Sequence, residues 1–94
     1  MKARWTVAAR RDLLEIWAYI ADDSLEAADR VADELAEAAQ RLTHFPEMGT
    51  LRESLGPNVR GIRVRNYLIF YRHSLNGIIV LWVLHGARDI EALF

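Results

Sequence analysis

The chain closes with LWVLHGARDIEALF, in which an apolar run stops at His85 and an arginine follows at Arg88. Imidazole titrates near neutrality and can exchange protons in catalysis, while a guanidinium can hold a phosphate or a carboxylate. Functional side chains are common on loops at strand ends. The alternative is structural: His85 hydrogen-bonds within the turn and Arg88 faces solvent or pairs with Asp89 or the chain end. The residue types alone leave both interpretations open.

Other arginines share the second half of the chain with His85. Nine of the thirteen acidic residues fall between Asp12 and Glu37, whereas residues 54–88 contain no acid. The arginines of that segment are Arg60, Arg63, Arg65, Arg72 and Arg88. This asymmetry predicts an anionic or acidic partner for the second half. A solvated strand face is the alternative for the first three, because alternation with apolar residues alone produces such a face.

Several kinds of site are not predicted. The chain has no cysteine, which excludes disulfides, thiolate catalysis and cysteine-ligated zinc or iron–sulfur centres. His44 and His73 stand apart from other ligand residues, so we expect no metal site, and we expect no cofactor. Asp12 and Glu15 lie outside the apolar face of a predicted helix. We expect them to be solvated rather than to form a catalytic carboxylate pair.

The elements that would position these residues follow from periodicity. The segment DLLEIWAYI predicts a helix, because its apolar residues have helical spacing. They are Leu13, Ile16, Trp17 and Ile20. Thr6 is the expected N-cap. The pattern resumes after residues 22–24, where Asp23 and Glu26 have the spacing of a capping box. This second helix is expected to end at about Phe45, because Pro46 disfavours helical backbone in the residue before it.

Beyond that loop the period changes to alternation. Residues 60–65 predict a strand, Asn66 a turn, residues 67–73 a second strand and Asn76-Gly77 a second turn. Residues 78–85 are almost wholly apolar and predict a strand buried on both faces. Residues 2–7 could form a short strand at an edge. The expected architecture is α+β, in the order β-α-α-β-β-β: a helical hairpin on one face of a small antiparallel sheet, in one domain of residues 1–94.

The large apolar residues divide into a core and a remainder. Trp5, Trp17 and Trp82 are expected in the core, and Tyr67 and Tyr71 are expected to pack against the helices. With 52% hydrophobic residues, 94 residues cannot bury them all in one core, so an exposed groove is expected to bind a partner. Its candidates are Leu25, Leu51, Leu55, Leu93 and Phe94.

Two features bear on location. No run of about eighteen apolar residues exists, so no membrane span is expected. The first residues, MKARWTVAARRDLLEIW, carry arginines and an aspartate where a signal peptide needs its apolar stretch. We therefore expect a cytoplasmic protein.

The chain resembles the ParE/RelE toxins of bacterial type II toxin–antitoxin systems, and it is most similar to the ParE branch. Four segments carry the resemblance in order: AARRDLLEIWAYIA, LTHFPEMG, VRGIRVRNYLIFYR and IIVLWVLHGARD. The resemblance implies a cognate ParD-like antitoxin encoded beside the toxin, growth inhibition when the antitoxin is lost, and a role in plasmid stabilisation. The antitoxin's C-terminal half would be disordered alone and would fold on binding.

The resemblance leaves the target to be decided. RelE-like members cut messenger RNA on the ribosome, using a lysine and arginine cluster or a glutamate and histidine pair, with a tyrosine near the C-terminus. Here Lys2 is the only lysine and no tyrosine follows Tyr71. ParE-like members poison DNA gyrase by binding, and HGARD resembles their ending. A third possibility is an inactive relative that only binds antitoxin.

We therefore predict a gyrase-binding toxin without catalytic residues and without sequence-specific DNA binding. The candidates for contact with the target are Arg60, Arg63, Arg65, Arg72, His85 and Arg88.

Overall fold

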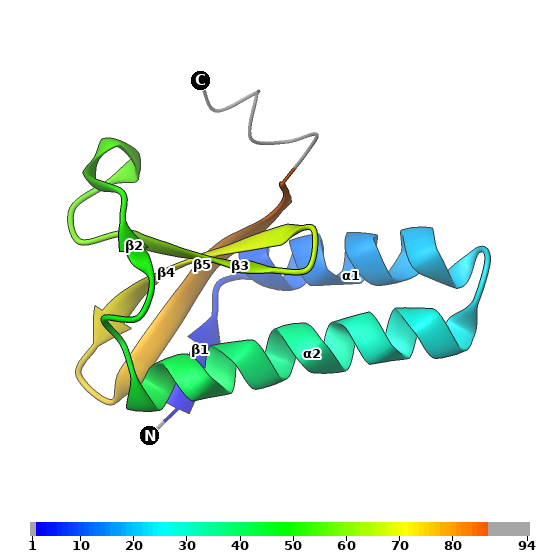
Figure 1. The fold of residues 1–94 in the computed structure, drawn as a ribbon, viewed down its shortest axis with the longest axis horizontal. Helices are drawn as coiled ribbons and strands as arrows, with labels where there is room; N and C mark the ends of the chain where they lie inside the picture. The colour runs from blue at the N-terminus through cyan, green and yellow to red at the C-terminus, as the bar shows by residue number, and fades with distance from the viewer. Residues whose placement is uncertain (1, 87–94) are drawn as a thin grey trace.

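The computed structural model describes residues 2–86, which form two helices on one face of a five-stranded sheet (Figure 1). The elements are β1 (Lys2–Trp5), α1 (Val7–Ala21), α2 (Leu25–His44), β2 (Thr50–Leu51), a short 3-10 helix (Glu53–Leu55), β3 (Arg60–Val64), β4 (Tyr67–Ser74) and β5 (Gly77–His85). The predicted α+β class and the order β-α-α-β-β-β are confirmed. The structure adds β2, which is too short to show alternation in the sequence.

The sheet has the strand order β1-β5-β4-β3-β2. β3, β4 and β5 form the predicted antiparallel meander, and β5 lies inside the sheet. β1 occupies an edge, as expected, but it runs parallel to β5, with Trp5 opposite Val80. The sheet is therefore mixed rather than antiparallel throughout.

The helix starts are fixed by side-chain caps. Thr6 caps α1 as predicted, since its Oγ1 accepts a hydrogen bond from the Ala9 N–H at 3.0 Å. For α2 the predicted cap at Asp23 is wrong, and Ser24 caps the helix by accepting from the Ala27 N–H at 3.1 Å. The Asp23 N–H bonds to Ile20 O, so Asp23 lies in the turn that follows α1, and Asp22 is the C-cap of α1.

Two turns depend on left-handed backbone. The Asn76-Gly77 turn is confirmed, and Gly77 has a φ of 144°. A Cβ on Gly77 would lie 2.0 Å from the Lys2 carbonyl oxygen, so glycine also permits the close approach of β1. Arg65 does not extend β3 as its alternation predicted. It adopts a φ of 55° and forms the β3–β4 turn with Asn66.

The core lies between α2 and the sheet. Its fully buried residues include Leu35 and Leu42 of α2 and Ile69, Tyr71 and Ile78 of the strands. Ala9 is the buried residue of α1. Tyr67 packs against this core, so both tyrosines face the helices as predicted.

The three tryptophans are only half-buried, which corrects the expectation that they form the core. Trp5 packs against the edge of the core. Trp17 of α1 reaches across to α2, where its Nε1 donates to Asp29 Oδ1 at 2.8 Å. Trp82 packs on Phe70, with ring centroids 5.6 Å apart. An indole needs a partner for its N–H, and positions at the edge of a core supply one more readily than the centre.

A β-bulge breaks the alternation of β5. Phe70 pairs with Trp82 while Tyr71 pairs with Val80, so Leu81 has no opposite residue on β4. Val80 and Val83 therefore both reach the helix-covered core, although they are three residues apart. The bulge explains in part why this strand has no period of two in its sequence.

Candidate functional site

The predicted arginines do not form one stripe. Arg60 and Arg63 are an odd number of residues apart on β3, so their side chains leave opposite faces of the sheet. Arg60 Nη1 donates to Gly49 O at 2.9 Å, over the end of α2. Arg63 Nε donates to Arg65 O at 3.0 Å, within the β3–β4 turn.

Arg65 joins the β3–β4 turn to α2. Its guanidinium forms a two-pronged ion pair with Glu34, and the Nη2–Oε1 distance is 2.9 Å. The hydrogen bond to Arg65 lowers the pKa of the Glu34 carboxyl, and the same contact raises the pKa of Arg65. Both side chains are partly exposed, and exposed pairs contribute little stability. The contact orients Arg65 toward α2 rather than toward a partner.

A mixed apolar and basic surface lies at the end of α2. We call it the α2–β2 surface and define it by Phe45, Met48, Leu51, Arg60 and Arg72. The first three side chains are 62%, 50% and 46% exposed. Two depressions of about 600 and 400 Å³ lie side by side on it, because both are lined by Pro46 and Glu47.

The sequence predicted only part of this surface. Leu51, Arg60 and Arg72 are predicted site residues that the fold brings together at the 400 Å³ depression. Phe45 and Met48 were missed, since in the sequence they belong to the signal that ends α2. A large apolar residue directly before the helix-ending Pro46 was the available indication.

The predicted apolar groove is not continuous. Leu25 begins α2 beside the α1–α2 turn, at the opposite end of the molecule from Leu51 on β2 (Figure 1). Leu55 is half-buried in the short 3-10 helix. Leu93, Phe94 and the target candidate Arg88 lie outside the described residues.

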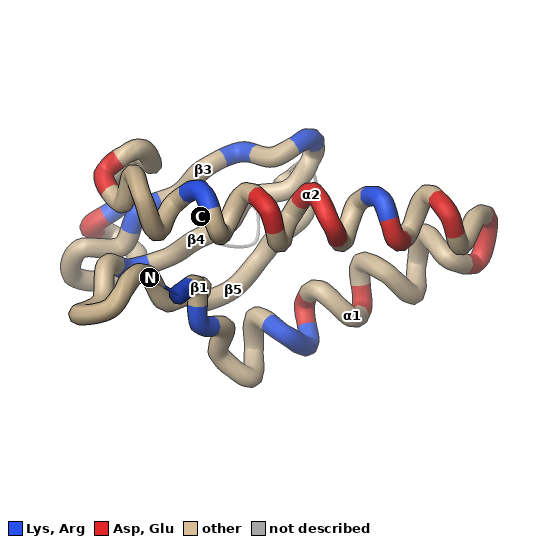
Figure 2. Tube along the Cα trace, turned by 90° about the horizontal axis from the view of Figure 1, so that it is seen from below, with Lys and Arg blue, Asp and Glu red and all other residues tan. Residues whose placement is uncertain are grey.

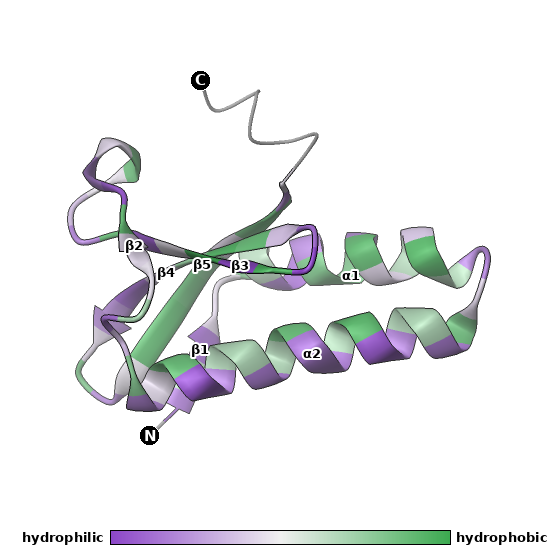
Figure 3. Ribbon diagram, in the orientation of Figure 1, coloured by the Kyte–Doolittle hydropathy of each residue, from purple (hydrophilic) through white to green (hydrophobic). Residues whose placement is uncertain are grey.

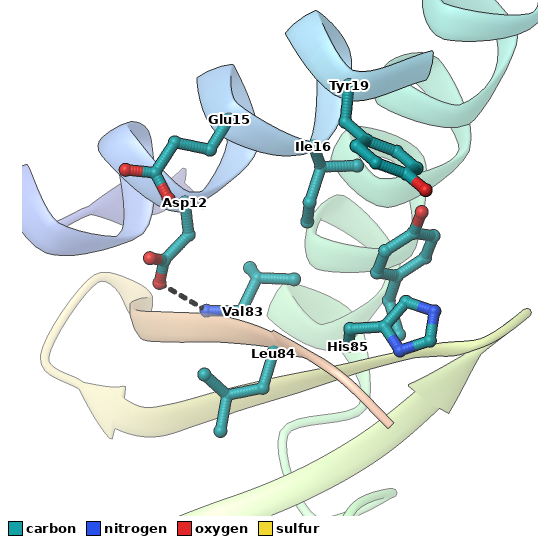
Figure 4. A pocket seen from close by; sticks show the side chains of 8 residues that line it. Asp12, Glu15, Ile16, Tyr19, Val83, Leu84 and His85 are labelled. Carbon is teal, nitrogen blue, oxygen red and sulfur yellow. Dashed lines mark hydrogen bonds between the residues drawn. The ribbon is translucent and has the colours of Figure 1, made fainter. Parts of the chain in front are cut away.

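His85 lies in a cavity of about 280 Å³ between α1 and the ends of β4 and β5 (Figure 4). Its ring makes an edge-on contact with Tyr67, with centroids 5.5 Å apart and an interplanar angle of 87°. The next residue, Gly86, donates its N–H to Asn66 O at 2.6 Å and ties the end of β5 to the β3–β4 turn. The remaining lining residues are Asp12, Glu15, Ile16, Tyr19, Val83 and Leu84.

Asp12 is half-buried and bonded to the sheet, which corrects the expectation of a solvated side chain. Its Oδ2 accepts a hydrogen bond from the Val83 N–H at 2.9 Å (Figure 4). Pairing between β1 and β5 stops at Val80. Beyond that point, the Thr6 hydroxyl donates to Leu81 O at 2.7 Å, and Asp12 accepts from the Val83 N–H two residues later. Side chains of α1 and its cap thus continue the edge bonding of β5.

The cavity contains groups that transfer protons but does not favour a phosphodiester. His85, Tyr67 and Glu15 are acid–base types, yet two carboxylates line the wall and no lysine or arginine of residues 2–86 does. Cleavage of RNA needs cations around the developing phosphorane charge.

Within residues 2–86, no group of three His, Cys, Asp or Glu residues is placed to hold a metal ion.

The described residues form a small two-layer protein, a helical hairpin packed on one face of a mixed five-stranded sheet. Residues 3–90 match the family "ParE toxin of type II toxin-antitoxin system, parDE". The chain therefore belongs to the ParE toxins of type II toxin–antitoxin systems.

One relative agrees with this assignment, and one solved structure shares the fold. The candidate toxin Y4kP of Sinorhizobium fredii is 35% identical over 90 residues, which cover 94% of this chain and 91% of that protein. The structure titled "Chromosomal ParDE TA system from P. aeruginosa" has a TM-score of 0.73 at 24% identity. The match covers 90% of this chain and 95% of that one, and it supports the fold.

Proposed function

We propose that this ParE-type toxin inhibits growth by binding DNA gyrase, without catalysis, and that a ParD-like antitoxin neutralises it. The observation that carries the proposal is the composition of the His85 cavity. The acid–base groups lie beside carboxylates, whereas Arg60 and Arg72 lie at the α2–β2 surface. Separating proton-transfer groups from cations favours binding over phosphoryl chemistry.

The α2–β2 surface suits an antitoxin segment that is both apolar and acidic. Phe45, Met48 and Leu51 offer apolar contact, and Arg60 and Arg72 border it with positive charge. An amphipathic segment that folds on binding would cover the apolar side chains and pair its acids with the arginines. Its binding would remove the exposed Phe45 ring from water.

Contact with gyrase would use other residues. Arg63 is exposed, and His85 lies at the end of β5, so both stay candidates together with Arg88. Gyrase acts on chromosomal DNA, so the proposed site of action is the cytoplasm. None of the helices in residues 2–86 is long and apolar enough to cross a membrane.

One observation favours a ribosome-dependent ribonuclease as the second candidate. His85, Tyr67 and Glu15 share a single cavity and could supply a general acid and base. The test incubates the purified chain with gyrase and relaxed plasmid, beside a translation reaction monitored for messenger cleavage.

We expect supercoiling to be inhibited and the messenger to stay intact. We expect His85→Gln to behave in the same way, because glutamine keeps the hydrogen-bonding capacity needed for contact and loses only the capacity for proton transfer. Messenger cleavage that His85→Gln abolishes would favour the nuclease. A chain inactive in both reactions would be a relative that only binds antitoxin.

A further inference from the structure

The outward face of α1 carries a row of apolar side chains among charged ones. Val7 is 69% exposed and Leu14 is 64% exposed, and Ala18 is exposed beside them. Spacings of seven and four residues place the three on one line along the helix, and the exposed Arg11 lies on the same line between Val7 and Leu14. The residues that α1 packs inward, such as Ala9 and Ile16, lie on the other side. α1 therefore has apolar side chains on two sides, of which the fold described here covers one.

α2 shows that this is not a general property of the hairpin. Its outward residues are almost all charged: Glu26, Asp29, Arg30, Asp33, Glu37 and Arg41. Figure 3 shows this difference along the two helices. A single helix that carries apolar side chains on its solvent face, next to one that does not, indicates a contact surface.

The charges of α1 are placed against its own dipole. Arg10 and Arg11 lie near its N-terminus, and Asp22 and Asp23 follow its C-terminus (Figure 2). Its first turn has no acid and its last turn no base. A helix dipole favours the reverse arrangement. α2 has that favourable arrangement, with Glu26 in its first turn and two basic residues in its last.

We propose that α1 is the contact surface for a second copy of this chain, with the two α1 helices antiparallel about a two-fold axis near Leu14. Leu14 then meets its own copy, and Val7 meets the C-terminal turn of the partner's helix. Arg11 lies across from the partner's Glu15, and Arg10 faces the end that carries the partner's Asp22. Each helix presents its basic end to the acidic end of the other, so charges that oppose the dipole within one chain are compensated across the axis.

The surface is small, so the dimer is weak and reversible. α1 has 15 residues, a length of about 22 Å. One helix pair buries less than the roughly 800 Å² per partner of a standard interface. We expect dissociation constants of about 10–100 µM. The α2–β2 surface lies at the other end of the molecule from most of α1 and stays accessible (Figure 1).

Sedimentation velocity of the chain, made by cell-free synthesis, tests the apolar part of the contact. We expect concentration-dependent dimerisation that Leu14→Glu weakens at least about tenfold. The matched control is Ala36→Glu, at an exposed position on α2, which should leave the dissociation constant unchanged. A wild-type chain that stays monomeric at about 200 µM, or a dimer insensitive to Leu14→Glu, would overturn the proposal.

Charge reversal tests the antiparallel orientation. One variant carries Arg10→Asp and Arg11→Asp, and the other carries Asp22→Arg and Asp23→Arg. Each alone should be monomeric, and the mixture should form heterodimers with wild-type affinity or better. Both should remain folded by circular dichroism, with unfolding midpoints shifted upward because their charges now suit the dipole. A mixture that does not associate would exclude the antiparallel pairing.

Discussion

Tyr71 shows how one buried hydroxyl fixes the loop that carries much of the α2–β2 surface. Its Oη donates to Pro46 O at 2.8 Å and accepts from the Gly49 N–H at 2.9 Å. A Cβ on Gly49 would lie 2.7 Å from that oxygen, so the glycine is needed for the approach. The loop is therefore tied to β4 at two backbone groups.

Tyr71→Phe should destabilise the protein by about 1–3 kcal/mol, because it leaves these two backbone groups without a partner. Urea unfolding followed by circular dichroism measures the change. Tyr19→Phe is the control, since Tyr19 is 73% exposed, and it should change stability by less than about 0.5 kcal/mol. Equal effects of the two substitutions would show that the hydroxyl does not hold the loop.

The same tyrosine predicts a dependence on alkaline pH. Burial raises the pKa of the Tyr71 phenol, against the opposing effects of the Gly49 N–H and the Arg60 charge. The folded state therefore holds this proton more tightly than the unfolded state. The contribution of this protonated phenol to the free energy of unfolding is fully present below the ordinary tyrosine pKa of about 10. It is lost as pH rises through the raised pKa of the folded state. The stability difference between wild type and Tyr71→Phe should shrink above that pH. A difference that stays constant to higher pH contradicts this assignment.

At the scale of elements, the junction of α1 with β5 depends on Asp12. The Val83 N–H lies where β1 no longer pairs with β5, and the Asp12 carboxylate accepts its hydrogen bond. Asp12→Ala should cost about 1–3 kcal/mol, and exchange of the Val83 amide hydrogen should accelerate. Asp12→Asn keeps an acceptor oxygen and should restore most of the protection. Unchanged exchange in the alanine variant would disprove the role.

Periodicity was sufficient to predict the elements but not their contacts. The helix pattern around Ile16, the cap at Thr6 and the stop at Pro46 all depend on neighbours in sequence, and all three were predictable. The ion pair of Arg65 with Glu34 and the bond from Val83 to Asp12 join positions 31 and 71 residues apart. No local pattern encodes such contacts. Alternation predicted one basic stripe, but the left-handed turn at Arg65 redirects that side chain.

At the scale of the whole molecule, the acidic and basic halves of the sequence do not become two uniform faces. The arginines of residues 54–86 point to the α2–β2 surface, to α2 or along the β3–β4 turn. Among the exposed apolar residues, Val7 and Leu14 lie on the outer face of α1 and Phe45, Met48 and Leu51 on the α2–β2 surface, while Leu25 and Leu75 lie apart from both. The proposed dimer contact and the proposed antitoxin contact would therefore use separate parts of the chain.

Leu51→Glu should weaken binding of the antitoxin encoded beside the toxin at least about tenfold, because it places a charge in the apolar part of the α2–β2 surface. Isothermal titration calorimetry measures the affinity. Leu75→Glu is the matched control, since Leu75 is fully exposed in the β4–β5 turn, and it should bind like wild type. Wild-type affinity in the Leu51 variant would place the antitoxin elsewhere.

We propose that this toxin acts by occupying gyrase rather than by turning over a substrate. Titrating the purified chain into a supercoiling reaction with a known gyrase concentration, well above the dissociation constant, tests it most directly. If the toxin is a binding inhibitor, supercoiling activity should fall linearly with added toxin and reach its minimum near molar equivalence with gyrase. Full supercoiling activity at a large molar excess of toxin, with messenger RNA cut many times per toxin molecule in a parallel translation reaction, would contradict the account.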